Sequence, residues 1–448
     1  MSDRAKRILK PFEENRAYME ERIASGIEAN RKGLGRLRFV DGKGNPVAGV
    51  HAEIRQKTHD FRFGANIFML EELETEEKNI AYQERFCELF NLATLPFYWC
   101  DLEPEQGKPR FEKDSPKIYR RPAPDLCIEF CEKNGIEPKL HCLNYDQWTP
   151  LWVPEDAPSV KKHLDRRIKQ IAERYRDKID GMEVINETLC GETDHPEGKH
   201  STRFFREPDI VEWSFEHARK YLPANKLIIN EATPFIWGDA FKYNRGAYYM
   251  QIERALAKGA SIDAIGMQYH MFYRAEEEEE RTKAFYNPYN LYGVMDRYAD
   301  FGKPMQITEV TIPAYSKEQE DEELQAEIIR NLYRIWFSHP NMEAIIYWNL
   351  ADGYAAFAPQ GDMSYGENYY HGALLHFDMS PKPAFFELKK LIHETWNTQL
   401  SLDGSEAGNL SMKGFYGKYE VSLTSGDKTV NTEIHLEKGA KNEFVIRI

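Results

Sequence analysis

The stretch Gly181–Leu189, GMEVINETL, decides how the rest of the chain is organised. Its apolar run ends on the polar pair Asn186–Glu187, which is typical of a buried parallel strand whose end opens on a cavity. Far downstream, residues 304–310, PMQITEV, repeat the pattern and carry the carboxylate Glu309. A single glutamate is more often a helix cap or half of a surface ion pair. Two glutamates at the ends of two buried strands indicate a shared site instead.

Short apolar runs of this kind recur along most of the chain. They lie at 61–68, 90–96, 139–144, 181–187, 226–231, 262–271, 304–310 and 344–350. The segments between them, such as 159–176 and 323–337, have apolar positions at helical spacing and charged outer faces. Eight strand–helix units predict an α/β protein built on a (β/α)8 TIM barrel over residues 59–400. In such barrels the active site lies at the carboxyl ends of the strands.

The two ends of the chain have other patterns. Residues 1–33 predict a charged N-terminal helix that stops at Gly33. Residues 34–58 predict a β-hairpin around a Gly- and Pro-rich turn, and the tail, residues 402–448, alternates with period two from residue 409 onward. Isolated ribbons are rarely stable, so we expect the hairpin and the tail to form one small β-sandwich beside the barrel rather than independent ribbons.

Composition restricts the class of partner. The formal net charge is −14 and no basic block is present, which argues against nucleic acid or an anionic membrane as partner. No apolar run approaches the ~20 residues that span a bilayer, and the N-terminus has no apolar signal segment. We expect a cytoplasmic protein, or a secreted one if a leader has been removed. The six cysteines form no CxxC motif, and no cofactor or metal is expected. The oligomeric state is left open.

Read in order, these runs resemble the motifs of glycoside hydrolase family 10, the xylanase family, over roughly residues 59–396. GMEVINETL is similar to the family's W-D-V-V-N-E, and QITEV to its I-T-E-L. IGMQYHM is similar to I-G-x-Q-x-H, and IIYWNLADG to V-W-G-x-x-D. HCLNYDQWTPLW, residues 141–152, is a variant of H-T-L-V-W-H-x-Q-x-P-x-W. No single motif is strong evidence for the family, but the occurrence of all of them in the family's order is.

The resemblance implies a double displacement with retention at the anomeric carbon. Glu187 would be the general acid/base and Glu309 the nucleophile, with the carboxyl groups about 5–5.5 Å apart. The other residues that it implies would bind or orient the sugar next to the reacting bond: Asn186 at the 2-hydroxyl, Gln268 beside the acid/base, His270 on Glu309, Trp348 under the −1 sugar, and His141 and Tyr145 from the third strand. For His141, a place in the core is the alternative.

The chain also departs from the family pattern. The family's x-E-N-x-x-K run after the second strand, which binds the −2 and −1 sugars, is replaced here by TLPFYWCDLEP, residues 94–104. A hydroxyl-binding group exchanged for an aromatic changes which sugar is accepted. We therefore predict an endo-acting retaining β-glycosidase for β-1,4-linked xylan or xylo-oligosaccharide-type glycans. The alternatives are a non-xylan β-glycoside as substrate and a carbohydrate-binding barrel with weak or lost catalysis. A metal-dependent hydrolase using His141, Asp146 and His270 has no supporting ligand spacing.

Overall fold

The computed structural model describes residues 2–190, 199–200, 202–238, 240–356 and 358–448. Its centre is a closed barrel of eight parallel strands, in the order β10-β11-β12-β3-β4-β5-β7-β9. The strands are β3 (Arg62–Asn66), β4 (Leu92–Pro96), β5 (Glu137–His141), β7 (Gly181–Asn186), β9 (Lys226–Glu231), β10 (Ala264–His270), β11 (Met305–Thr311) and β12 (Met342–Tyr347). Each coincides with one of the eight apolar runs, so the predicted barrel is confirmed.

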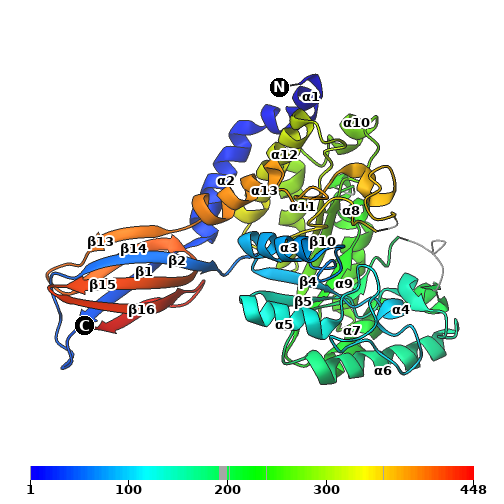
Figure 1. Ribbon diagram of the computed structural model, residues 1–448, viewed down its shortest axis with the longest axis horizontal. Coiled ribbons are helices and arrows are strands. Elements are labelled where there is room, and N and C mark those ends of the chain that lie inside the picture. Colours follow the sequence, from blue (N-terminus) through cyan, green and yellow to red (C-terminus); the bar gives the residue numbers. More distant parts are fainter. Residues whose placement is uncertain (1, 191–198, 201, 239, 357) are drawn as a thin grey trace.

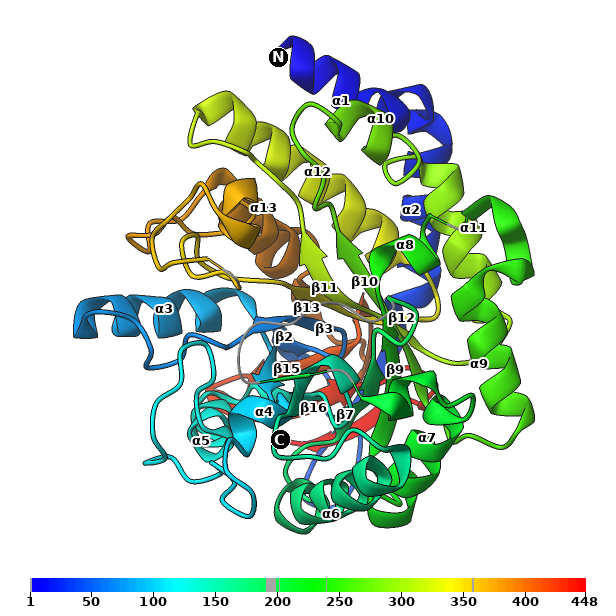
Figure 2. The ribbon, with the colours of Figure 1, turned by 90° about the vertical axis from the view of Figure 1, so that its right-hand side faces the viewer.

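Helices surround these strands, as Figure 2 shows. The longer ones are α3 (Glu76–Leu89), α5 (Pro124–Asn134), α6 (Ala157–Tyr175), α7 (Ile210–Tyr221), α9 (Ala247–Ala257), α11 (Pro288–Ala299), α12 (Gln319–Ser338) and α13 (Pro383–Lys390). Short elements fill the loops: α4 (Trp99–Leu102), η1 (Asp146–Trp148), β6 (Thr149–Pro150), β8 (Lys199–His200), η2 (Arg203–Arg206), α8 (Thr233–Ile236), η3 (Ala240–Arg245), α10 (Glu278–Thr282), η4 (Gly366–Tyr370) and η5 (Leu391–Thr395). None of the helices described is long and apolar enough to cross a membrane.

The N-terminal segment is two helices, not the single helix that its spacing predicts. α1 (Asp3–Glu14) and α2 (Arg16–Asn30) are separated at Asn15, whose side-chain nitrogen donates to the carbonyl oxygen of Pro11 at 2.7 Å. An asparagine that bonds to nearby backbone competes with helical hydrogen bonds, which is why the helix breaks there. α2 packs on α12: a Cβ at Gly26 would lie 2.6 Å from the carbonyl oxygen of Ser338, so only glycine permits this approach.

The remaining strands form two sheets that share a hydrophobic core. One sheet has the order β14-β1-β17 and the other β13-β2-β15-β16. Their bounds are β1 (Lys32–Val40), β2 (His51–His59), β13 (Gln399–Asp403), β14 (Asn409–Phe415), β15 (Gly417–Ser425), β16 (Lys428–Leu436) and β17 (Glu443–Arg447). The predicted hairpin is wrong, because β1 and β2 lie in different sheets. β1 pairs on its two edges with β14 and β17, and β2 pairs with β13 and β15, all of which belong to the C-terminal tail.

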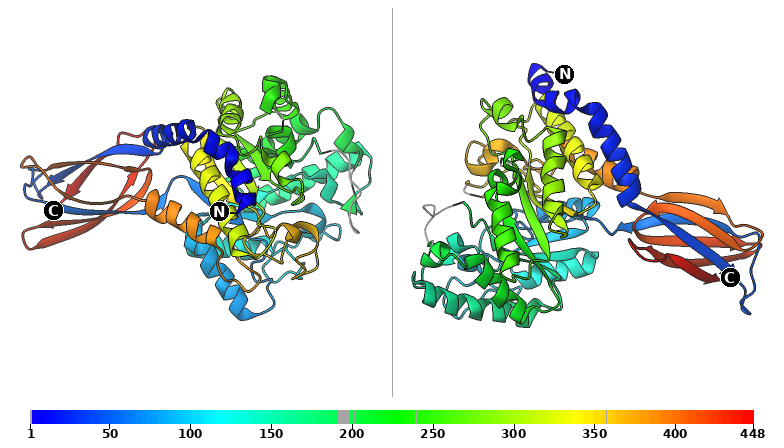
Figure 3. Two further views of the ribbon diagram at one scale, coloured as in Figure 1. Left: turned by 90° about the horizontal axis from the view of Figure 1, so that it is seen from above. Right: turned by 180° about the vertical axis from the view of Figure 1, so that it is seen from behind.

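The sandwich projects from one end of the barrel (Figures 1 and 3). Only Asp60 and Phe61 separate β2 from the first barrel strand, so the chain passes directly from the sandwich to the amino end of β3. A cavity of about 370 Å³ at this junction is lined by Phe61, Pro304 and Met342 from the barrel and by Tyr416 and Lys438 from the sandwich. The sandwich therefore packs at the amino ends of the strands, opposite the end where barrel active sites lie.

Candidate active site

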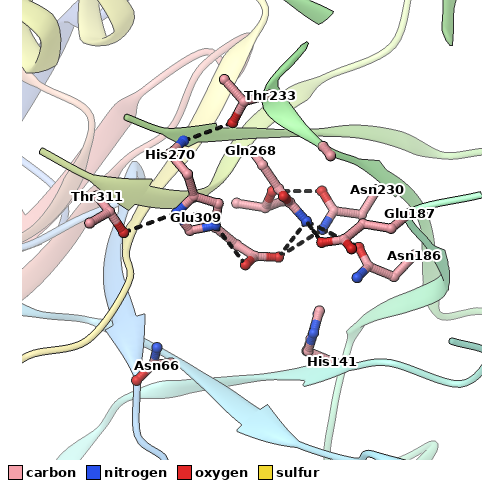
Figure 4. A network of polar contacts seen from close by, with 12 residues as sticks. Asn66, His141, Asn186, Glu187, Asn230, Thr233, Gln268, His270, Glu309 and Thr311 are labelled. Atoms are coloured by element: carbon pink, nitrogen blue, oxygen red, sulfur yellow. Dashed lines mark hydrogen bonds and ion pairs between the residues drawn. The ribbon is translucent and has the colours of Figure 1, made fainter. Parts of the chain in front are cut away.

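Two glutamates meet at the carboxyl end of the barrel (Figure 4). Glu187 directly follows β7, and Glu309 lies on β11. The side-chain nitrogen of Gln268, on β10, donates to Oε1 of Glu187 at 2.8 Å and to Oε1 of Glu309 at 3.0 Å. These two carboxyl oxygens are therefore less than about 6 Å apart, a separation that suits two carboxylates acting on opposite sides of one glycosidic bond.

The backbone at the first of these glutamates has an uncommon conformation. Glu187 has a φ of 54°, in the left-handed region that residues other than glycine seldom adopt. Such a conformation costs on the order of 1–3 kcal/mol, and it is found where a fold fixes a functional side chain. The hydroxyl of Tyr145 also donates to Oε2 of Glu187, so both oxygens of this carboxyl group are held.

Neutral donors surround the second glutamate. Oε1 of Glu309 also accepts a hydrogen bond from the side-chain nitrogen of Asn230 at 3.1 Å, and Oε2 lies 3.1 Å from Nε2 of His270. Burial raises the pKa of Glu309 to about 8. Burial also lowers the pKa of His270 to about 4, so this ring is neutral at pH 7. A neutral ring satisfies both contacts if Nε2 donates to Glu309 and Nδ1 accepts from Thr311, at 2.9 Å.

The side chain of Asn230 connects Asn186 with Glu309. Besides its bond to Glu309, its side-chain nitrogen donates to Oδ1 of Asn186 at 2.9 Å, and its Oδ1 accepts from the hydroxyl of Thr308 at 2.6 Å. In Figure 4 the amide nitrogen of Asn186 points into the open space between the strands, where a sugar hydroxyl would accept from it. A Cβ at Gly266 would lie 2.5 Å from Oδ1 of Asn230, so glycine is required for this arrangement.

A charged cluster lies beside the site, on β5 and β7. The Glu183 carboxylate bonds to Nζ of Lys139 and to Nδ1 of His141, and all three side chains are buried. Burial alone would lower the pKa of His141, but the Glu183 carboxylate raises it overall. His141 lines the cavity and lowers the pKa of Glu309 by its positive charge, although burial of Glu309 outweighs this effect.

Aromatic rings form one wall of the cavity, next to His141. Trp348, after β12, packs its ring edge-on against Phe68 with the ring centres 5.2 Å apart. Tyr98, from the segment after β4, lies 4.5 Å from Trp148 and 5.3 Å from His141, again between ring centres. Sugar rings have apolar faces that pack on such surfaces. This wall includes part of the 94–104 segment, where the sequence departs from its family pattern.

The structure brings every predicted site residue to one cavity of about 620 Å³. They are Asn186, Glu187, His141, Tyr145, Gln268, His270, Glu309 and Trp348. Asp146, considered above as a metal ligand, accepts a hydrogen bond from the backbone nitrogen of Thr202 at 2.7 Å. Within the described ranges, no group of three or more His, Cys, Asp or Glu side chains is arranged to hold a metal ion.

Sequence reasoning assigned no role to several residues in or beside the cavity. Asn230, which bonds to Asn186 and Glu309, is the second-last residue of a predicted strand, so its position was a usable signal. Arg120, Arg121 and Glu367 line the cavity, and they come from connections without periodic pattern. No sequence signal placed them there.

A (β/α)8 barrel with two bridged glutamates after its fourth strand and on its seventh defines a barrel glycoside hydrolase. The sequence matches the family model described as Glycosyl hydrolase family 10 over residues 70–391. The chain belongs to that family.

The relatives of known sequence are distant. The anti-sigma-I factor RsgI6 of Acetivibrio thermocellus is 23% identical over 92% of this chain and 48% of that protein. The endo-1,4-beta-xylanase B of Thermotoga neapolitana is 24% identical over 75% of this chain and 88% of that protein. The chain thus spans about half the length of the first relative and most of the second.

Solved structures share the fold. The native xylanase 10B from Thermotoga maritima superposes with a TM-score of 0.57 at 21% identity, covering 75% of this chain and 96% of that one. The GH10 structure from Paenibacillus barcinonensis gives a TM-score of 0.56 at 22% identity, with coverage of 74% and 95%. The part of this chain outside those superpositions is about a quarter of its length.

Proposed function

We propose that this protein is a retaining, endo-acting β-glycosidase that hydrolyses β-1,4-linked glycans of the xylan type. One observation carries the proposal: a single amide nitrogen, that of Gln268, bonds to Glu187 and to Glu309. The two oxygens that accept from it are less than about 6 Å apart, which is compatible with the roughly 5–5.5 Å between carboxyl groups that double displacement uses. Sequence relatives named endo-1,4-beta-xylanase support the choice of glycan and of endo action.

In the first step, Glu187 gives its proton to the leaving glycosidic oxygen while Glu309 attacks the anomeric carbon from the other face. The bond to the leaving sugar breaks, and an ester between the glycone and Glu309 forms. In the second step, Glu187 removes a proton from water, which attacks the same carbon and releases Glu309 as a carboxylate. Two inversions at one carbon give net retention.

The neighbouring side chains support these two roles. His270 and Asn230 donate to Glu309 and orient its oxygens toward the anomeric carbon. Tyr145 holds the acid/base group through both steps. Asn186 would donate to the sugar 2-hydroxyl, a contact that strengthens as positive charge develops at the anomeric carbon.

Turnover of a substrate panel tests the proposal. We expect the wild type to cleave an aryl β-xyloside or a xylo-oligosaccharide, with gluco- and arabino-oligosaccharides as comparisons. Glu309→Ala should lower kcat/KM by about four orders of magnitude or more, since the nucleophile acts only in the transition state. Glu129→Ala, which removes an exposed carboxylate of α5, is the matched control and should keep full activity.

Azide separates the two glutamates. In Glu309→Ala, azide takes the place of the nucleophile and gives an α-glycosyl azide by one inversion. In Glu187→Ala, azide replaces water in the second step and gives the β-glycosyl azide by two inversions. Activity that survives Glu309→Ala contradicts this mechanism. A wild type that cleaves no sugar of the panel, yet gains thermal stability from one, is a carbohydrate-binding protein instead.

A further inference from the structure

Two arginines, Arg120 and Arg121, lie in the aromatic wall of the cavity. The guanidinium carbon of Arg121 lies 3.9 Å from the centre of the Tyr98 ring and 5.0 Å from that of Trp148. The guanidinium carbon of Arg120 lies 5.6 Å from the centre of the Phe68 ring. Both arginines line the cavity although only 5% and 8% of their surfaces are exposed. The reaction centre and these cations therefore share one binding space.

The two cations differ in their partners. Nε of Arg121 forms an ion pair with Asp101 at 2.7 Å, so its charge is compensated. Arg120 donates from Nη1 to Oδ1 of Asn349 at 3.0 Å and to the backbone oxygen of Tyr354, and both acceptors are neutral. Among the described residues it has no carboxylate within ion-pair distance, and its buried Nε has no acceptor. A guanidinium group stays protonated even when buried, so Arg120 is a buried cation with no carboxylate in direct contact.

The carboxylate of Glu367 also lines the cavity, and it stabilises the charge of Arg120 only from beyond ion-pair distance. Glu367 accepts from the side-chain nitrogen of Asn349 at 3.0 Å, the same side chain whose oxygen accepts from Arg120. Asn349 thus stands between cation and anion. Burying a charge without a direct partner of opposite charge is unfavourable, so a buried cation in the wall of a cavity is a candidate for binding an anionic ligand. The position of Arg120 in the wall of a substrate cavity indicates an anionic group on the substrate.

The surrounding chemistry favours a carboxylate on a sugar ring. The planar fork of a guanidinium group matches the two oxygens of a carboxylate. The adjacent rings of Tyr98 and Trp148, 4.5 Å apart, supply an apolar surface for a pyranose face. We propose that the cavity binds a β-glycan bearing a uronosyl unit, that Arg120 recognises its carboxylate, and that Arg121 and its aromatic neighbours position the acidic sugar. This inference rests on the proposed hydrolase and adds the class of sugar that it accepts.

Selectivity between matched substrates tests the proposal. We would compare kcat/KM for xylo-oligosaccharides that carry a glucuronosyl unit with kcat/KM for neutral ones of the same length. The wild type should prefer the acidic substrate. Arg120→Gln should reduce that preference about tenfold to a hundredfold, because a charge-assisted hydrogen bond is lost. Arg120→Lys should retain part of it, since the charge remains and the fork does not.

Two controls protect the comparison from folding effects. Each preference is a ratio measured on one enzyme sample, so a lower folded fraction cancels. Arg174 lies near the end of α6 and forms an ion pair with Asp125 of α5, away from the cavity lining. Arg174→Gln breaks this pair and should leave the ratio at its wild-type value. Arg121→Gln provides a second variant in the same wall if Arg120→Gln does not fold.

The outcomes separate this inference from the proposed function. If neutral substrates are cleaved at least as well and Arg120→Gln leaves the ratio unchanged, the uronosyl assignment is wrong and the hydrolase stands. A preference for sulfate esters over uronosyl substrates likewise overturns the carboxylate assignment. If no substrate is cleaved, calorimetric binding of the same two oligosaccharides decides: tighter binding of the acidic one, lost in Arg120→Gln, supports the proposal, and equal binding refutes it.

Discussion

Two buried carboxylates inside the same barrel have opposite surroundings. Burial would raise the pKa of Glu183, but its contacts with Lys139 and His141 outweigh burial and lower the pKa to about 2. Glu309 accepts hydrogen bonds mainly from neutral groups, and burial raises its pKa to about 8. A carboxylate paired with cations anchors the fold, whereas one held by neutral donors is able to exchange a proton near neutral pH.

The largest effect on stability is expected from Glu183→Gln. Removing one partner of a buried ion pair leaves Lys139 uncompensated and should lower the free energy of unfolding by about 3–5 kcal/mol. Since the folded pKa lies below the unfolded value of about 4.5, this contribution is complete above pH 4.5 and is lost as the pH falls toward 2. Chemical denaturation of wild type and variant at pH 7 measures this loss in the free energy of unfolding. The same comparison at pH 3 measures how much of the contribution acid removes.

The exposed pair of Lys113 and Glu129 provides the matched control. Glu129→Gln should change stability by less than about 0.5 kcal/mol, because both side chains are more than half exposed. If Glu183→Gln is equally harmless at pH 7, the buried cluster does not anchor the barrel.

Glu309→Gln should have the opposite effect on stability. A carboxyl group whose pKa is raised on folding destabilises the folded state increasingly as the pH rises from about 4.5 toward 8. The amide removes this penalty, so the variant should be more stable at pH 7 by about 1–3 kcal/mol while it loses activity. The difference should vanish at pH 4. A variant that is less stable than the wild type at pH 7 contradicts a raised pKa of Glu309 in the folded state.

The same raised pKa predicts the alkaline limit of activity. In the proposed mechanism, catalysis needs one proton on the Glu187–Glu309 pair, carried by Glu187 when substrate reacts. Because Glu309 keeps the pair protonated up to about pH 8, kcat/KM should fall about tenfold per pH unit above that value. Initial rates from pH 5 to 10 report this limb. A decline that begins below pH 6 shows that burial of Glu309 does not hold the proton on the pair.

The smallest expected effect concerns a glycine. Gly266→Ala would push a methyl group against Asn230 and disturb its bonds to Glu309 and Asn186, lowering kcat about tenfold. Gly293→Ala, on α11 with open space around it, should leave kcat unchanged. Equal kcat in the two variants would show that Asn230 does not orient the nucleophile.

The sequence revealed the barrel because each buried strand is a short apolar run of its own, and the family match over residues 70–391 confirms the resemblance that these runs carry. The candidate site was visible because its side chains follow those runs at strand ends. Both signals are local in the chain.

Features that depend on distant partners were not visible. β1 and β2 read as a hairpin because the turn between them is recognisable, whereas their real partners lie in the C-terminal tail. Arg120 lies in an irregular loop and is held by Asn349, 229 residues further along. The local hydrophobic pattern of the sequence carries no information about a contact between residues so far apart in the chain.

The composition of the sandwich has a consequence for the order of folding. β1 and β2 leave the ribosome before the barrel, but every strand that pairs with them follows it, from residue 399 onward. Throughout synthesis of the barrel their backbone hydrogen-bonding groups have no partner, and exposed strand edges are sites of association between chains. The sandwich therefore closes only after the barrel has been synthesised, through contacts of very high sequence separation, which form slowly.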